Sequence, residues 1–198
     1  TMQDGERALL KNDLIGGIIL FSHNYESKPQ LYSLIQDIKS VKDDILITID
    51  HEGGRVQRLL HDFTHLQSFE DISNIKNYDE MISKAYESGY IGASELSEIG
   101  IDINYSPVVD INHDKSNKLL KDRTFGNDIK SIIALSDSYI KGCIDGNILP
   151  VMKHFPGHGR VITDSHIEDC ISKIDFKTLN DTDILPFKEI HSRFSEYN

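Results

Sequence analysis

The sequence predicts an α/β protein with a parallel sheet, and two observations support this prediction. Short apolar runs alternate along the chain with longer segments whose apolar residues recur at helical spacing. Polar residues gather directly after each apolar run, where the two common parallel folds, the (β/α)8 barrel and the open doubly wound sheet, place their ligands. No repeat, low-complexity tract or linker interrupts the 198 residues, so we expect one domain over residues 1–198.

Four apolar runs predict the strands of this sheet. They are short and rich in branched apolar residues, as strands buried on both faces usually are. The runs cover residues 16–21, 45–50, 101–106 and 148–153. No Gly-x-Gly-x-x-Gly or Walker A pattern follows any of them, which argues against a nucleotide-binding site.

Four segments between and after these runs predict helices. The first begins at Ser27, a capping residue, with Pro29 in its first turn. The long second helix is expected to end at Gly100. The helical patterns cover residues 27–41, 82–99 and 129–146, and a last helix is expected from about residue 183 to the chain end.

Composition and charge exclude several classes of protein. The sequence has 21 Lys and Arg against 32 Asp and Glu, a net charge of −11, which argues against a nucleic-acid binder or an anionic-membrane binder. The longest apolar stretch, residues 14–21, is far shorter than the ~20 residues of a membrane helix. No signal peptide is visible, and Cys143 and Cys170 are expected to be reduced, buried thiols. We therefore expect a cytoplasmic protein.

The segment after the fourth apolar run holds the densest cluster of reactive side chains. Lys153, His154 and His158 stand close together there, and Asp164 and His166 follow shortly after. A carboxylate two residues before an imidazole can hold its tautomer and raise its basicity. A histidine held in this way can act as general acid and base near neutral pH. The structural alternative is a set of loop histidines with a capping aspartate.

The same cluster also allows a metal-dependent hydrolase on the same class of fold. His154 and His158, completed by Asp164 and His166, could form a metal site. However, Pro156 lies between the first two histidines, so they cannot share a helix face, and no cysteine joins them. We therefore expect no metal but keep this hydrolase as an alternative.

A second cluster follows the 45–50 run. Asp50 ends a buried strand, where a carboxylate is costly unless it is hydrogen-bonded or bound to a ligand such as the paired hydroxyls of a sugar. Arg55 and Arg58 add planar donor groups, and Arg123 on a later loop could also reach a ligand. The alternative is an internal ion pair of Asp50 or Glu52 with an arginine. For Glu52 and Arg55 we favour that structural role.

Together these segments resemble glycoside hydrolase family 3, in particular its bacterial β-N-acetylglucosaminidases of peptidoglycan recycling. The most specific motif is Lys-His-Phe-Pro-Gly-His-Gly at residues 153–159, followed by Asp-Ser-His at 164–166. The motifs Ile-Asp-His-Glu-Gly-Gly-Arg-Val-Gln-Arg at 49–58 and Tyr-Ser-Pro-Val-Val-Asp at 105–110 also fit. The resemblance covers nearly the whole chain.

The resemblance implies a (β/α)8 TIM-barrel-type catalytic domain that hydrolyses terminal, non-reducing β-linked N-acetylglucosamine with retention of configuration. It implies a small saccharide as partner and no metal or organic cofactor. By this likeness His166 is the acid/base and Asp164 orients it. The residues expected to hold the sugar are Asp50, Arg58, Arg123, Lys153 and His154.

Three departures from the family pattern stand out. His51 occupies a position where the family usually has Gln, and Asp122 one where Glu is common. The family's nucleophile, an Asp in a Ser-Asp-Asp type motif on a later strand, has no counterpart before Asn198. We therefore expect a partial barrel of about four to five βα units, since a complete one takes about 250 residues. A non-catalytic sugar-binding fragment is a further alternative.

Overall fold

The computed structural model describes residues 2–113, 119–161 and 169–194. Four parallel strands form its main sheet in the order β1-β2-β5-β6, which follows the sequence as predicted. These strands are β1 (Gly17–Leu20), β2 (Leu46–Ile49), β5 (Ile103–Asn104) and β6 (Leu149–Pro150). The last two are shorter than the predicted runs 101–106 and 148–153. The parallel sheet with its helices is of the TIM-barrel type.

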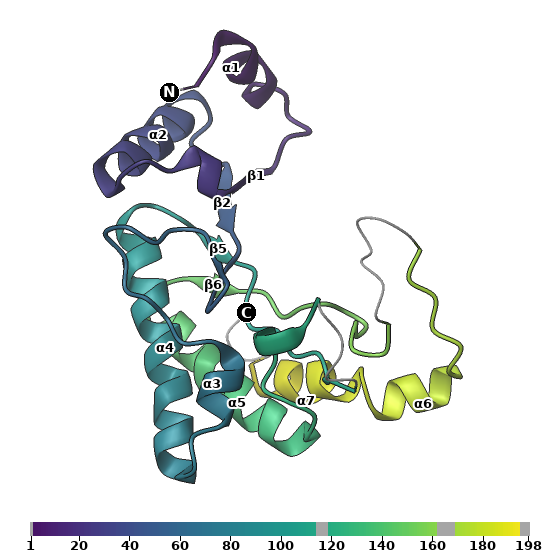
Figure 1. The fold of residues 1–198 in the computed structure, drawn as a ribbon. Helices are drawn as coiled ribbons and strands as arrows, with labels where there is room; N and C mark the ends of the chain where they lie inside the picture. Colours follow the sequence, from purple (N-terminus) through teal and green to yellow (C-terminus); the bar gives the residue numbers. More distant parts are fainter. Residues whose placement is uncertain (1, 114–118, 162–168, 195–198) are drawn as a thin grey trace.

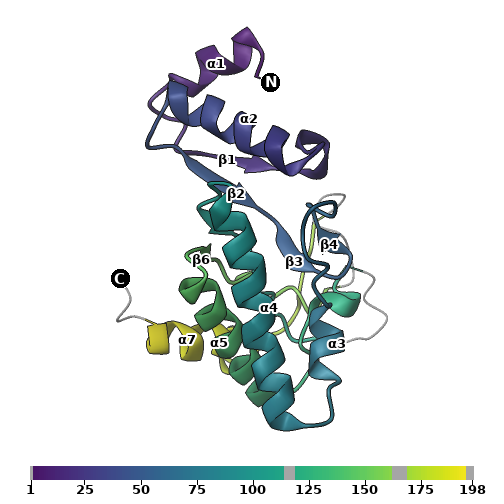
Figure 2. The same cartoon turned by 90° about the vertical axis from the view of Figure 1, so that its left-hand side faces the viewer.

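Helices pack along this sheet (Figure 1). Figures 1 and 2 show α1 and α2 beside β1 and β2, and Figure 1 shows α4, α5 and α7 on the side of β5 and β6. The four predicted helices are present, and the expected end of the last one, at residues 195–198, lies outside the described residues. The bounds are α1 (Asp4–Leu10), α2 (Lys28–Val41), α3 (Phe69–Ser73), α4 (Tyr78–Glu98), α5 (Ile129–Asp145), α6 (Phe176–Asp181) and α7 (Leu185–Phe194).

Several elements differ from the predictions. Helix α4 begins at Tyr78, before the expected residue 82, because the Asn77 side chain accepts a hydrogen bond from the Glu80 amide and caps an acidic first turn. The short helices α1, α3 and α6 are not among the four predicted helices. An antiparallel ribbon of β3 (His51–Gly53) and β4 (Val56–Gln57) was also missed, and two short 3-10 turns occur at Ser22–Asn24 (η1) and Lys121–Arg123 (η2).

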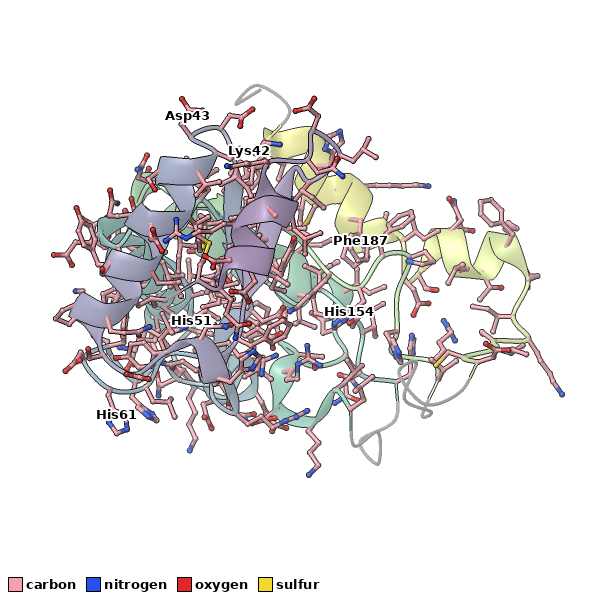
Figure 3. All side chains as sticks on the ribbon, turned by 90° about the horizontal axis from the view of Figure 1, so that it is seen from above. Lys42, Asp43, His51, His61, His154 and Phe187 are labelled. Atoms are coloured by element: carbon pink, nitrogen blue, oxygen red, sulfur yellow. The ribbon has the colours of Figure 1, made fainter. Side chains whose placement is uncertain are left out.

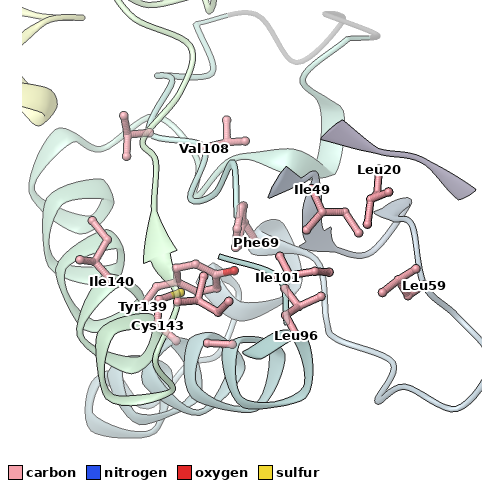
Figure 4. Close-up of a cluster of buried hydrophobic side chains, with 14 of the residues drawn as sticks. Leu20, Ile49, Leu59, Phe69, Leu96, Ile101, Val108, Tyr139, Ile140 and Cys143 are labelled. Carbon is pink, nitrogen blue, oxygen red and sulfur yellow. The ribbon is translucent and has the colours of Figure 1, made fainter. Parts of the chain in front are cut away.

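The two faces of the parallel sheet differ in burial. Ile47 and Ile49 on β2 are fully buried, in the core that Figure 4 shows. On the opposite face, Ile19 of β1 and Leu149 of β6 lie in one cross-strand row and are 40% and 59% exposed. In a closed barrel such a row is an interior layer. Within the described residues this row is open at the outer strands β1 and β6, each of which has one neighbour, whereas Thr48 of β2 in the same row is 5% exposed.

The core also corrects the prediction of two buried thiols. Cys143 lies on α5 beside Tyr139 in the core (Figure 4), and burial raises the pKa of its thiol to about 12. Cys170 is only partly buried. No helix in the described part of the chain is long and apolar enough to cross a membrane.

Helices α4 and α5 approach each other closely through glycines. A Cβ at Gly142 of α5 would overlap the carbonyl oxygen of Tyr86 on α4, and a Cβ at Gly89 would overlap that of Tyr139. The overlapped atoms belong to the backbone, so neither helix can relieve the overlap by moving a side chain. This contact fixes α4 against α5 behind the strands.

We expect Gly142→Ala to lower the free energy of unfolding by about 1–3 kcal/mol, the usual cost of overpacking. Alanine favours a helix by up to about 1 kcal/mol over glycine, so the clash outweighs that gain. The matched control is Gly5→Ala in α1, where nothing lies within 4 Å of the new Cβ. Urea unfolding of both variants tests the contact. Equal midpoints for the two would show that the helices tolerate the methyl group.

Candidate active site

The carboxyl ends of β2 and β6 bring Asp50 and Lys153 together. Asp50 directly follows β2, and the amide of the next residue, His51, donates to the Asn104 side chain on β5 at 2.9 Å. Lys153 follows β6 and forms a parallel bridge with Val108. The Lys153 Nζ then lies 2.6 Å from Asp50 Oδ1, although 103 residues separate them. Parallel topology therefore places the two predicted sugar-binding groups at one edge.

Glu52 forms ion pairs with two cationic side chains, Arg123 and Lys153. Its carboxylate accepts two hydrogen bonds from Arg123, 2.8 Å from Nε and 2.7 Å from Nη2, and its Oε1 lies 2.6 Å from Lys153 Nζ. Glu52 is 2% exposed. Both of its oxygens are occupied, so the internal ion pair that we favoured for Glu52 is present. Arg55 likewise pairs internally, with Asp122 at 2.8 Å.

The charges around Asp50 keep it ionised. Burial acts to raise the pKa of Asp50, but the Lys153 ammonium and the Arg58 guanidinium outweigh it, so this pKa lies below its usual value. Arg58 Nη2 is 3.5 Å from Asp50 Oδ2, and its guanidinium lies over the Phe21 ring. Asp50 is therefore an anionic acceptor flanked by donors.

His154, labelled in Figure 3, extends the cluster toward the next strand connection. Its Nδ1 lies 2.6 Å from Asp110 Oδ2, and its Nε2 faces Arg123 Nη2 at 3.3 Å. Asp110 is 1% exposed and also accepts a hydrogen bond from the His158 amide at 2.7 Å. Sequence reasoning did not single out Asp110. A carboxylate directly after the apolar pair Val108 and Val109 was the signal that could have found it.

His51, also labelled in Figure 3, is buried behind the edge at 1% exposure. Neither of its ring nitrogens has a hydrogen-bond partner among the described residues. Burial, aided by Arg58, lowers the pKa of His51 to about 4, so the ring is neutral at pH 7. Its ring tilts against Phe63, which makes it a packing residue.

The structure joins all five predicted sugar-binding residues in one chain of polar contacts. Three acidic groups alternate with three cations and one imidazole along it. Each residue in this series contacts the next, in the order Arg58, Asp50, Lys153, Glu52, Arg123, His154 and Asp110. Such a cluster presents both charge-assisted donors and an anionic acceptor, which is the combination that vicinal hydroxyls require.

The predicted acid/base pair, Asp164 and His166, lies outside the described residues. Two of the four residues of the alternative metal site are therefore also outside them. Among the described residues, no group of three or more His, Cys, Asp or Glu could hold a metal ion. The ring of His154 lies between Asp110, at 2.6 Å from Nδ1, and the cation Arg123, at 3.3 Å from Nε2.

A parallel sheet whose strand order follows the sequence, with a polar cluster at its carboxyl edge, is the arrangement of the TIM-barrel class of proteins. The family model for the glycosyl hydrolase family 3 N-terminal domain matches residues 1–192, and the chain therefore belongs to glycosyl hydrolase family 3.

Individual relatives agree with this assignment. A β-hexosaminidase of Glaesserella parasuis is 36% identical over 186 residues, which cover 93% of this chain and 53% of the relative. The solved structure of NagZ from Neisseria gonorrhoeae in complex with N-trifluoroacetyl-D-glucosamine is 32% identical with a TM-score of 0.91, covering 97% of this chain and 57% of that one. A family 3 β-N-acetylglucosaminidase from Paenibacillus is 30% identical with a TM-score of 0.89, covering 96% and 36%. The chain spans about half the length of the curated relatives it matches.

Proposed function

We propose that the complete protein hydrolyses terminal, non-reducing β-linked N-acetylglucosamine with retention, in the cytoplasmic recycling of peptidoglycan. The observation that carries this proposal is the ionised Asp50 beside Lys153 at the carboxyl edge of a family 3 barrel. The similarity to a NagZ that binds an N-acylated glucosamine supports this substrate class. A muropeptide-like saccharide is the substrate that we propose.

In this proposal Asp50 accepts hydrogen bonds from sugar hydroxyls, and Lys153 and Arg123 donate to them. Arg58 and His154 complete the sugar-binding group. His166 acts as the acid/base and Asp164 orients it. Retention needs a carboxylate nucleophile across the sugar ring from the acid. The 198 residues contain no Ser-Asp-Asp motif, and we propose that the complete protein supplies the nucleophile from outside them.

We expect Asp50→Ala to weaken binding of N-acetylglucosamine by about 2–3 kcal/mol, or roughly 30- to 150-fold, as for other charged hydrogen bonds. The fold should persist because Lys153 keeps Glu52 as a partner at 2.6 Å. Isothermal titration of the complete gene product measures the affinity, with the exposed Asp43→Ala as a charge-matched control. Unchanged affinity in Asp50→Ala would remove Asp50 from the sugar site.

The activity itself is tested with an aryl β-N-acetylglucosaminide and the purified complete gene product. Hydrolysis that persists after dialysis against a chelator is the expected result. Loss of turnover on chelation, with recovery on adding a divalent metal, would favour the metal-dependent alternative. Binding of N-acetylglucosamine without any turnover would favour a non-catalytic sugar-binding protein.

A further inference from the structure

We propose that Asp110 is a positioning residue that fixes the tautomer of His154 and thereby makes His154 Nε2 a hydrogen-bond acceptor for a hydroxyl of the sugar. The part of this inference that concerns the sugar rests on the proposed function. The part that concerns the tautomer rests only on the contacts of Asp110, His154 and Arg123.

The surroundings of Asp110 determine which nitrogen of His154 carries the proton. Asp110 Oδ1 accepts a hydrogen bond from the His158 amide at 2.7 Å, and the His154 amide lies 3.3 Å from both carboxylate oxygens. Oδ2 lies 2.6 Å from His154 Nδ1. A carboxylate has no proton to donate, so Nδ1 must be the donor in this contact. Asp110 therefore selects the form of His154 that is protonated at Nδ1.

The opposite nitrogen is constrained by Arg123. His154 Nε2 faces Arg123 Nη2 at 3.3 Å, and a guanidinium only donates. An N–H at Nε2 would point one donor at another, so Nε2 carries a lone pair. The neutral imidazole protonated at Nδ1 is the form that satisfies both Asp110 and Arg123.

This lone pair has a use in a site rich in donors. Lys153, Arg58 and Arg123 can only donate hydrogen bonds, whereas each sugar hydroxyl also has a proton that needs an acceptor. Glu52 is 2% exposed, whereas the side chain of Asp50 is 21% exposed, so Asp50 and His154 Nε2 are the accessible acceptors in the cluster. The His154 side chain is 33% exposed, and its contact with Arg123 is long, so a hydroxyl can reach Nε2. Asp110 thus supplies the site with a second acceptor.

Asp110→Asn tests the tautomer through a change of one atom. The backbone N–H of His158 must still face an oxygen, so the asparagine turns its NH2 group toward His154 Nδ1. That contact needs a lone pair on Nδ1 and moves the ring proton to Nε2, the wrong tautomer for accepting a hydroxyl proton. The contact of Nε2 with Arg123, already 3.3 Å long, must then open, because both atoms would be donors. We expect the inhibition constant of N-acetylglucosamine for the complete gene product to rise by roughly tenfold or more.

The direct readout is the ¹⁵N NMR spectrum of the labelled complete gene product, with His154 assigned by comparison with His154→Gln. In the wild type at alkaline pH we expect a protonated Nδ1 and an unprotonated Nε2, and in Asp110→Asn the reverse. The control is Asp183→Asn, because Asp183 is also 1% exposed and pairs with a ring nitrogen, His113 Nε2 at 2.8 Å. This control should leave the His154 signals as in the wild type.

The wild-type spectrum decides the inference even if Asp110→Asn does not fold. A wild-type His154 protonated at Nε2, or charged at that pH, would overturn the proposal. If Asp110→Asn folds and reverses the tautomer, an unchanged inhibition constant would overturn the role of Nε2 toward the sugar. The spectrum is recorded without substrate, so failure of the proposed hydrolysis would appear separately, as absent turnover with the expected tautomer.

Discussion

Replacing His166 with alanine in the complete gene product is expected to lower the rate of β-N-acetylglucosaminide hydrolysis by roughly 10²–10⁴, the usual range for a general acid–base group. The leaving oxygen needs a proton as its bond breaks, and the same group must later accept a proton from water. An imidazole titrates near neutral pH and can do both. Asp164, two residues earlier, can hold its tautomer.

The leaving group distinguishes acid catalysis from a general disturbance of the site. For a dinitrophenyl leaving group, which departs without a proton, the loss in the bond-breaking step should be much smaller than for a methylphenyl one. The exposed His65→Ala is the control and should retain the wild-type rate for both substrates. An equal loss for the two substrates in His166→Ala would remove His166 from the acid role.

Glu52→Gln is expected to lower the free energy of unfolding by about 3 kcal/mol, the lower end of the range for breaking a buried ion pair. Glu52 is 2% exposed, and its loss leaves the 11%-exposed Arg123 side chain without its carboxylate. Lys153 keeps Asp50 as a partner at 2.6 Å, which limits the effect.

Urea unfolding of the complete gene product measures this difference. The matched control is Glu98→Gln, which removes a pair of the same length, 2.6 Å to Lys28, but with Glu98 67% exposed. The control should cost less than about 1 kcal/mol, as surface pairs usually do. Equal small changes in both variants would show that Glu52 does not hold the cluster together.

Periodicity in the sequence was enough to predict the main sheet and its long helices. The strands around Ile47 and Ile103 are apolar runs, and parallel order with alternating helices follows from their spacing. The ribbon of β3 and β4 was missed because its strands have only three and two residues, too few to show an alternating pattern. Helices α3 and α6 are too short to show a helical period.

The sequence predicts which site residues lie close together where these residues follow strands of the parallel sheet. Asp50 and Lys153 both end strands of one parallel sheet, so their meeting follows from the strand pattern of the sequence. The pairing of Glu52 with Arg123 does not, because Arg123 lies in η2, a short turn whose place depends on packing. The role of Asp110 could not be predicted either, because it depends on the burial of this side chain and on its contact with His154, 44 residues later in the sequence.

The most direct test of the central claim is ¹H NMR of the first sugar that the complete gene product releases from an aryl β-N-acetylglucosaminide. The account predicts that the β-anomer of N-acetylglucosamine appears first and then mutarotates, since two successive inversions retain the configuration. First appearance of the α-anomer, or no release of N-acetylglucosamine by folded protein, would contradict it.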